Sequence, residues 1–196
     1  MKFVELRPFI NQVLSSRTRG KILSLDVGKK HVGLALSDES KQFVSPSITL
    51  GRPALASAMQ ELVNKEKVCG VVVGIPLLDG KPTPFCTDIV NLMLSMQVLT
   101  SESDSPSPVL DANRLTQNTG NVRPSQIPSE TAPARTRQLM PFTLWDEQFS
   151  TMEARRFVAQ STSKRNIYLK HKDSVAAAVI LQKFLVFAEA EGGHEK

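Results

Sequence analysis

The stretch that decides the fold is Lys21-Ile-Leu-Ser-Leu-Asp-Val-Gly-Lys-Lys-His-Val-Gly-Leu-Ala-Leu-Ser-Asp38. Strand-type residues lead into Asp26, Gly28 follows two positions later, and a second strand-like run, 31–37, leads back. A carboxylate at the mouth of a hairpin, beside backbone that only glycine leaves uncovered, can hold a metal ion or a phosphate. The alternative is that Asp26 only ends a strand and supports the turn, as aspartate often does.

The composition is that of a globular protein with one domain of ordinary size. The chain has 196 residues, of which 41% are hydrophobic and 22% are charged. No apolar run approaches the roughly 20 residues needed to span a bilayer, which excludes a membrane-embedded protein. The net charge of +5 favours polyanionic partners such as nucleic acids. Cys69 and Cys86 are too few for a disulfide framework, so we expect reduced core cysteines.

The first twenty residues allow two interpretations. Arg7, Arg17 and Arg19 are features of an organelle transit peptide, but Glu5 and the lack of a cleavage pattern weigh against one. Apolar residues in this segment fall at helical spacing, so we expect an N-terminal helical extension over residues 1–20. The expected location is the cytoplasm, with a chloroplast or mitochondrion as the alternative.

The middle of the chain predicts alternating strands and helices. Residues 21–27, 31–37 and 43–50 read as three antiparallel strands joined by short turns. A helix over about 53–65 precedes the apolar run 68–75, which is typical of a central strand buried on both faces. Residues 77–84 then predict a loop with a turn at Asp79-Gly80, and 83–98 a second helix.

The composition changes between residues 100 and 140. This stretch is rich in Ser, Thr, Asn, Gln and Pro, and no aromatic residue occurs between Phe85 and Phe142. It offers too little apolar surface to offset the entropy lost on ordering, so we expect a disordered insertion over 100–140. The ordered domain would therefore comprise residues 21–99 and 141–190.

The C-terminal part resumes with a predicted strand, residues 141–147, which ends in Asp146 and Glu147. A capping-box sequence, Ser150 to Glu153, predicts a helix to about 160, and a polar link over 161–172 precedes a last helix over 173–189. The expected architecture is α/β: a mixed five-stranded sheet with helices on both faces.

Three acids stand at the predicted ends of elements: Asp26 and Glu147 after strands, and Asp173 at the start of the last helix. Ligands of open α/β sheets gather at the carboxyl ends of strands, so these acids would converge if their strands are neighbours. Converging carboxylates are hard ligands for Mg²⁺ or Mn²⁺, which can support phosphodiester cleavage. The alternatives are that Asp173 only favours a helix N-terminus and that Glu147 is an ordinary surface acid.

Basic residues surround these acids in the sequence. We expect a nucleic-acid-binding surface formed by Lys29, Lys30, His31, Arg155 and Lys172. The three histidines show no ligand spacing with one another or with the cysteines, so a zinc site is not predicted.

Taken together, the motifs resemble the YqgF (RuvX) family of Holliday-junction-resolvase-like and pre-16S ribosomal RNA nucleases. Four segments carry the resemblance, in the family's order: 22–38, 71–80, 146–154 and 172–182. The resemblance implies a ribonuclease-H-like fold and maps the family's catalytic and metal-binding acids onto Asp26, Glu147 and Asp173. The chain departs from the family pattern at Lys29, His31 and Gln148, where the family usually has Thr, a base such as Arg, and Arg.

The expected function is that of a metal-dependent nuclease that hydrolyses phosphodiester bonds in structured RNA, by resemblance the 5′ end of pre-16S-type ribosomal RNA. One alternative is a resolvase of branched DNA, which would use the same acids. Another is a non-catalytic RNA-binding module of the same fold, which Gln148 and the insertion favour. The oligomeric state stays open, with a homodimer as one option.

Overall fold

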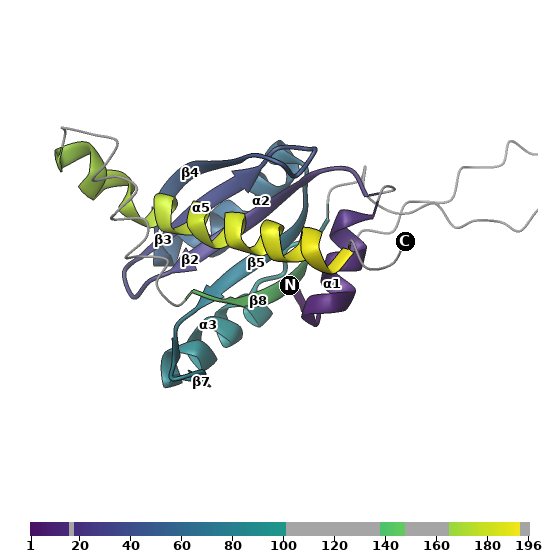
Figure 1. Ribbon diagram of the computed structural model, residues 1–196. Coiled ribbons are helices and arrows are strands. Elements are labelled where there is room, and N and C mark those ends of the chain that lie inside the picture. Colours follow the sequence, from purple (N-terminus) through teal and green to yellow (C-terminus); the bar gives the residue numbers. More distant parts are fainter. Residues whose placement is uncertain (16–17, 101–137, 148–164, 193–196) are drawn as a thin grey trace, which may run out of the picture.

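The structure is a computed structural model that describes residues 1–15, 18–100, 138–147 and 165–192, with side chains of the last segment described for 172–191. A six-stranded sheet forms its centre, with the strand order β1-β8-β5-β2-β3-β4 (Figure 1). The strands are β1 (Lys2–Phe3), β2 (Lys21–Val27), β3 (His31–Ser37), β4 (Val44–Gly51), β5 (Val68–Ile75) and β8 (Pro141–Asp146). The first four strands in the sheet order, β1, β8, β5 and β2, are parallel, and β3 and β4 continue antiparallel. The predicted mixed α/β sheet is confirmed.

The strand count differs from the prediction at one edge. The two residues of β1 add a sixth strand beside β8, where Lys2 N–H donates to the carbonyl oxygen of Met140. Two residues are too short for a pattern of alternating hydrophobicity, so the sequence carried no signal for this strand. The predicted 77–84 loop also contains a small hairpin, β6 (Leu77–Leu78) with β7 (Lys81–Pro82), around the expected turn at Asp79-Gly80.

Helices cover both faces of the sheet. On one face lie α2 (Leu55–Glu66), entered through the short 3-10 helix η1 (Arg52–Ala54), and α3 (Pro84–Ser95), which Thr83 caps. On the other lie α1 (Leu6–Leu14) and the long α5 (Arg165–Gly192) (Figure 1). Each face has its own buried apolar cluster, with Leu25 and Met59 in one and Phe9 and Phe184 in the other. The segment expected as an N-terminal helical extension contains α1, preceded by β1.

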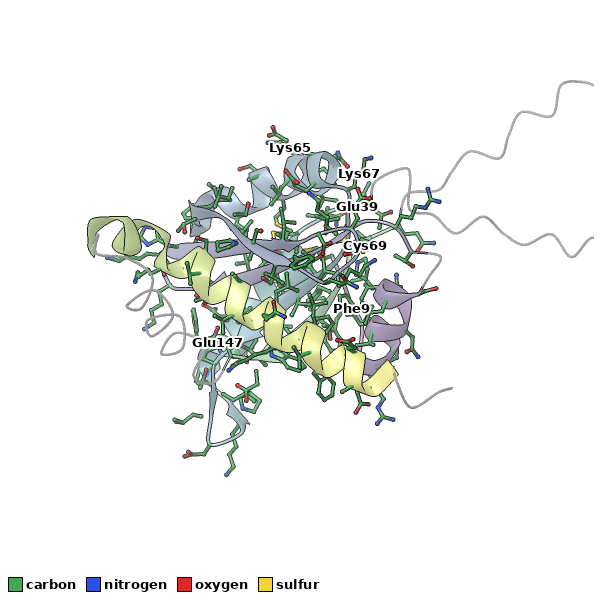
Figure 2. All side chains as sticks on the ribbon, turned by 45° about the horizontal axis from the view of Figure 1, so that its top comes forward. Phe9, Glu39, Lys65, Lys67, Cys69 and Glu147 are labelled. Carbon is green, nitrogen blue, oxygen red and sulfur yellow. The ribbon has the colours of Figure 1, made fainter. Side chains whose placement is uncertain are left out.

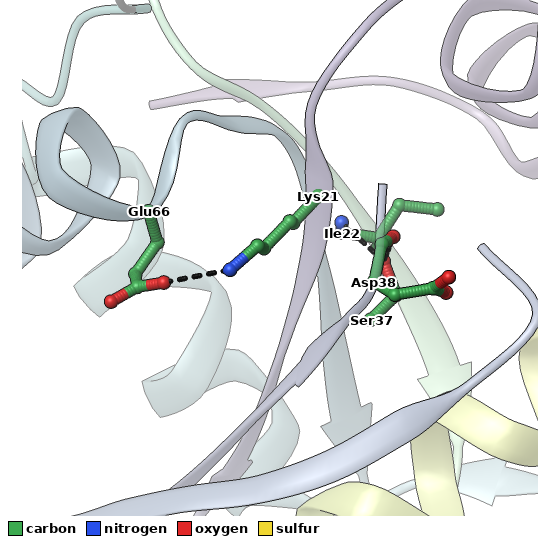
Figure 3. Close-up of polar contacts among 5 residues, drawn as sticks. All are labelled: Lys21, Ile22, Ser37, Asp38 and Glu66. Carbon is green, nitrogen blue, oxygen red and sulfur yellow. Dashed lines mark hydrogen bonds and ion pairs between the residues drawn. The ribbon is translucent and has the colours of Figure 1, made fainter. Parts of the chain in front are cut away.

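The start of β2 is tied to its neighbours by polar contacts at the end of the sheet away from Asp26. Lys21 Nζ lies 2.9 Å from Glu66 Oε2, and the backbone N–H of Ile22 donates to Ser37 Oγ at 2.9 Å (Figure 3). Ser37 Oγ donates in turn to the carbonyl oxygen of Asp38 at 2.8 Å. These contacts pair β2 with β3 and α2, and they set the register along the central strands.

The last helix starts earlier than predicted. It begins at Arg165 rather than at Asp173, so Asp173 lies inside α5 and the interpretation of this residue as a helix N-terminus is wrong. No Gly or Pro stands between residues 165 and 173 to stop a helix, and the polar composition of this stretch was mistaken for a link. The predicted helix over 150–160 lies outside the described residues.

The boundaries of the predicted insertion also move inward. Leu99 and Leu139 form an antiparallel bridge, and Thr100 N–H donates to the carbonyl oxygen of Gln138 at 2.8 Å. Met140, assigned to the insertion, is fully buried. Residues 101–137 lie outside the described part of the chain, so their expected disorder stays a prediction. Within the described part, no helix is long and apolar enough to cross a membrane.

Candidate active site

Asp26 lies in a row of residues that crosses four strands. It pairs with Gly33 of β3 on one side and with Gly74 of β5 on the other, and Gly74 pairs in turn with Trp145 of β8. Side chains alternate along a strand, so Asp26 projects from the same face as Ser24. Ser24 Oγ donates to the carbonyl oxygen of Ala177 in α5 at 2.7 Å. The Asp26 carboxylate therefore lies on the α5 face, between two glycines.

Gly33 brings the α5 backbone onto the sheet beside Asp26. A Cβ atom built on Gly33 would lie 1.9 Å from the carbonyl oxygen of Asp173 and 2.6 Å from the backbone nitrogen of Ser174. Because backbone atoms cannot move aside like a flexible side chain, only glycine permits this crossing. Asp173 is thereby held next to Asp26, where its charge acts on the Asp26 carboxyl group.

Gly74, on the β5 side of Asp26, leaves room for the side chain of Glu147. Glu147 directly follows β8, and its backbone N–H donates to the carbonyl oxygen of Ile75 at 3.1 Å. A Cβ atom on Gly74 would lie 2.8 Å from Glu147 Oε2, so the carboxyl group occupies the space that a side chain would take. Figure 2 labels Glu147 at the end of the molecule where β8 ends. Here Glu147 forms a side-chain hydrogen bond with Asp26.

The charges in this pair are strongly coupled. Burial, followed by the charge of Asp173, raises the pKa of Asp26 to about 6, while the hydrogen bond with Glu147 and the charge of Lys172 act in the opposite direction. Burial and then the neighbouring Asp26 raise the pKa of Glu147 to about 8. At neutral pH the pair therefore retains one proton, which the hydrogen bond between the two carboxyl groups holds. Two half-buried carboxyl groups that do not readily ionise together are typical of a functional site that binds a cation.

The donor set suits a hard divalent cation held by few protein ligands. Asp26 is the common member, with Glu147 hydrogen-bonded to it and Asp173 close enough to act through its charge. Among the described residues, no group of three or more acidic, histidine or cysteine side chains is arranged so that it could hold a metal ion, so Asp173 stands apart from the closer pair of Asp26 and Glu147. Mg²⁺ is usually held through one or two carboxylates and keeps several waters, so an open arrangement of this kind fits Mg²⁺ or Mn²⁺.

The predicted basic residues lie near the acids to different degrees. Lys29, Lys30 and His31 are exposed in the turn between β2 and β3, closed by a hydrogen bond from Gly28 N–H to the carbonyl oxygen of His31 at 2.9 Å. Lys172 is exposed, and its Nζ lies 3.6 Å from Asp173 Oδ1. Arg155 lies outside the described residues.

Three residues near the acids were not identified from the sequence. Gly33 and Gly74 are glycines inside strands, a signal of close backbone approach that could have identified them. The third is Arg52, whose backbone N–H donates to the carbonyl oxygen of Lys30 at 2.8 Å and whose guanidinium lies over the ring of Phe85. Nothing local in the sequence marked this arginine, because its side-chain contacts, with Phe85 and Asp88, come from α3.

A cavity of about 790 Å³ lies elsewhere, at the opposite end of the sheet. Residues from the end of α1, the turn after β3 and the C-terminal half of α5 line it, among them Arg19, Lys41 and Glu189. None of the three acids lines this cavity. The converging carboxyl groups, rather than the size of a hollow, therefore define the candidate active site.

Comparison with known proteins agrees with this geometry. The sequence model of the RuvX family, described as "Holliday junction resolvase", matches residues 20–101 and 118–186. A protein of Sphingopyxis alaskensis is 31% identical over 167 residues, covering 83% of this chain and 84% of that protein. Proteins of Paramagnetospirillum magneticum (28% identical; 89% of this chain and 91% of that protein) and Zymomonas mobilis (30%; 84% and 79%) are similar. All three carry the name "Putative pre-16S rRNA nuclease". The family match covers most of the chain, and with the fold and the acids described above it shows that this chain belongs to the RuvX family.

Proposed function

We propose that this protein is a metal-dependent nuclease that hydrolyses phosphodiester bonds in structured RNA, with the precursor of small-subunit ribosomal RNA as its substrate. The observation that carries the proposal is the carboxyl pair of Asp26 in β2 and Glu147 after β8, hydrogen-bonded across the intervening β5 with Asp173 beside it. Such a pair has little structural value, because burying two mutually repelling acids disfavours the folded state.

The residues divide the work as follows. Asp26, Glu147 and Asp173 would hold Mg²⁺ or Mn²⁺, with Asp26 as the central ligand because it interacts with both other acids. When bound, the cation supplies Lewis acidity and lowers the pKa of a coordinated water. Glu147 would bind such a cation as the carboxylate, since a positive charge opposes the effects of burial and of Asp26 that raise its pKa. In the reaction a water molecule loses a proton to solvent as its oxygen bonds to phosphorus. The bond from phosphorus to the leaving oxygen breaks, and the leaving oxygen takes up a proton.

The basic residues would hold the substrate backbone. Lys29, Lys30 and His31 border Asp26 in the chain, and Lys172 borders Asp173. Arg155 belongs to the same proposal through its place in the sequence. Phosphate contacts of this kind position a nucleic acid without reading its sequence. We therefore propose recognition of the shape of a structured RNA.

RNA is favoured over branched DNA because the relatives from three bacteria carry the name of a pre-16S ribosomal RNA nuclease. Branched DNA is the second candidate, since the family model itself is described as a Holliday junction resolvase. Both reactions would use the same acids, so the substrate has to be tested directly.

The decisive experiment offers an end-labelled pre-16S-type RNA and a four-way DNA junction to the full chain, each with Mg²⁺, with Mn²⁺ and with EDTA. We expect metal-dependent cleavage of the RNA, which Asp26→Asn abolishes. Glu61→Gln is the control, because Glu61 is an exposed acid on α2, which covers the face of the sheet opposite to α5. Cleavage of the junction alone would favour the resolvase, and binding of RNA without cleavage would favour a non-catalytic RNA-binding module.

For the cellular setting we propose the cytoplasm, as a reducing compartment. Cys69 and Cys86 are buried as thiols, which fits an environment without disulfide formation. A homodimer stays a prediction that analytical ultracentrifugation of the full chain would test.

A further inference from the structure

The hairpin of β6 and β7 directly follows β5, at the edge of the sheet where the candidate active site lies. Pro76 ends β5, and Leu77 and Leu78 then pair antiparallel with Pro82 and Lys81. The two turn residues, Asp79 and Gly80, have φ of 50° and 73°. Positive φ at both central positions is typical of a type I′ turn, the tight turn that matches the twist of a two-stranded ribbon. The hairpin tip therefore has a defined shape.

The tip presents an apolar side chain to solvent. Leu78 is 68% exposed and belongs to neither of the two core clusters. Its partner across the hairpin is Lys81, and a Cβ atom on Gly80 would meet no atom within 4 Å. A single exposed leucine is ordinary on a protein surface, so exposure alone does not indicate a role for Leu78.

That position is beside the acids. Ile75, the last residue of β5, accepts the hydrogen bond from Glu147 N–H at 3.1 Å, and Leu78 follows three positions later. At roughly 3.4 Å per residue, the Leu78 backbone lies within about 10 Å of that bond. Successive nucleotides of a stacked strand are about 3.4 Å apart, so this distance corresponds to roughly three nucleotides. In Figure 2 the hairpin projects from the body next to the labelled Glu147.

The charges at the tip rule out a simple phosphate clamp. Asp79 and Lys81 are both exposed and carry opposite charges, so the tip has no net attraction for a polyanion. An apolar side chain that reaches a nucleic acid can insert at a base step and unstack it. We propose that the β6–β7 hairpin is a wedge, in which Leu78 packs against an unstacked base where paired and unpaired RNA meet, no more than about three nucleotides from the candidate active site. This inference rests on the proposed nuclease function and adds the substrate feature that the site selects.

The test compares Leu78→Ala with Leu94→Ala, a control leucine that is 49% exposed on α3. The probes are an RNA hairpin with a single-stranded tail and 2-aminopurine at the junction, and a uniform RNA duplex of the same length. Binding is measured in EDTA and cleavage in Mg²⁺. With the unsubstituted chain we expect the 2-aminopurine fluorescence to rise and the junction to bind more tightly than the duplex.

Leu78→Ala should abolish the fluorescence rise and reduce the preference for the junction by roughly fivefold or more, the change expected when about 1 kcal/mol of binding free energy is removed. The salt dependence of binding should stay unchanged, because the substitution removes no charge. Leu78→Phe should restore both properties, whereas a defect caused by misfolding would not be restored. If Leu78→Ala matches Leu94→Ala in fluorescence and preference, the wedge is overturned.

The outcomes separate this inference from the proposed function. Cleavage that does not depend on Leu78 would leave the nuclease standing and remove the wedge. Unstacking that depends on Leu78, without cleavage of any RNA, would keep the wedge and remove the nuclease. Failure of the unsubstituted chain to bind either RNA would overturn both.

Discussion

Replacing Asp26 by Asn should stabilise the metal-free protein at high pH while it removes metal binding. The substitution keeps the volume of the side chain and deletes its charge. Burial and Asp173 raise the pKa of Asp26 from 3.8 to about 6, so the folded state favours the neutral acid. The resulting stabilisation is fully present below the unfolded pKa and is lost as the pH rises through about 6. For Glu147, whose pKa is raised to about 8, the loss continues to higher pH.

The magnitude follows from the pKa. A change from 3.8 to about 6 corresponds to roughly 3 kcal/mol of unfolding free energy at pH 8, since each tenfold change in the ionisation constant is worth about 1.4 kcal/mol. In a domain of this size, 1 kcal/mol moves the melting temperature by roughly 2–4 °C. We therefore expect Asp26→Asn to melt roughly 6–12 °C above the unsubstituted protein at pH 8 in EDTA, and close to it at pH 4.

The assay is calorimetry and urea unfolding of both proteins at pH 4 and pH 8, with Glu61→Gln as the exposed-acid control. Added Mg²⁺ at pH 8 should stabilise the unsubstituted protein, because a ligand that binds only the folded state raises its stability. The same Mg²⁺ should leave Asp26→Asn unchanged. A stability difference between the two proteins that is the same at both pH values would refute the explanation of the raised pKa.

Three further predictions concern the surface, the insertion and the glycines. Lys29→Ala with Lys30→Ala should weaken RNA binding, and it should lower the salt dependence of binding by about one unit or less for each phosphate that is no longer neutralised. Unchanged binding in a salt titration would exclude this turn from the RNA interface. Replacing residues 101–137 by a short Gly/Ser turn should leave the melting temperature within a few degrees, because the bridge between Leu99 and Leu139 already brings the two ends together; a large drop would show that the segment packs. Gly33→Ala should destabilise the fold by about 3 kcal/mol or more in urea unfolding, at the upper end of overpacking, because its Cβ would strike the α5 backbone. Gly51→Ala, whose Cβ would meet only Pro53 at 3.9 Å, should cost less than about 1 kcal/mol, roughly the size of an ordinary surface change, and equal destabilisation by the two substitutions would contradict the steric reason.

The sequence was sufficient to predict the strands whose pattern of apolar residues is local. The runs 21–27, 31–37 and 68–75 were predicted with the bounds that the structure has, because alternating or continuous apolar residues reflect burial on one or both faces. The strand predicted over 141–147 is β8, which ends one residue earlier, at Asp146. The last helix was predicted to start too late, because polar residues in a long helix look like a link when the packing partner is unknown.

For the candidate site too, the sequence determined one part and the tertiary structure decided another. The sequence by itself determined the chemistry that is available: three acids at or near the ends of elements, with basic residues beside them, in the order of a known family. It could not place these acids together, because Asp26, Glu147 and Asp173 are far apart along the chain. Only the tertiary structure decided that, by inserting β5 between β2 and β8 and by crossing α5 over β3.

The physical reason lies in Gly33 and Gly74. Each leaves the space of one missing side chain beside Asp26, and the Asp173 backbone and the Glu147 carboxyl group fill those spaces. Burial and then the charge of Asp173 raise the pKa of Asp26, and burial and then Asp26 raise that of Glu147; these effects exist only when the strands and α5 have packed. Sequence thus determined which groups can react, and packing decided which of them meet and with what charge.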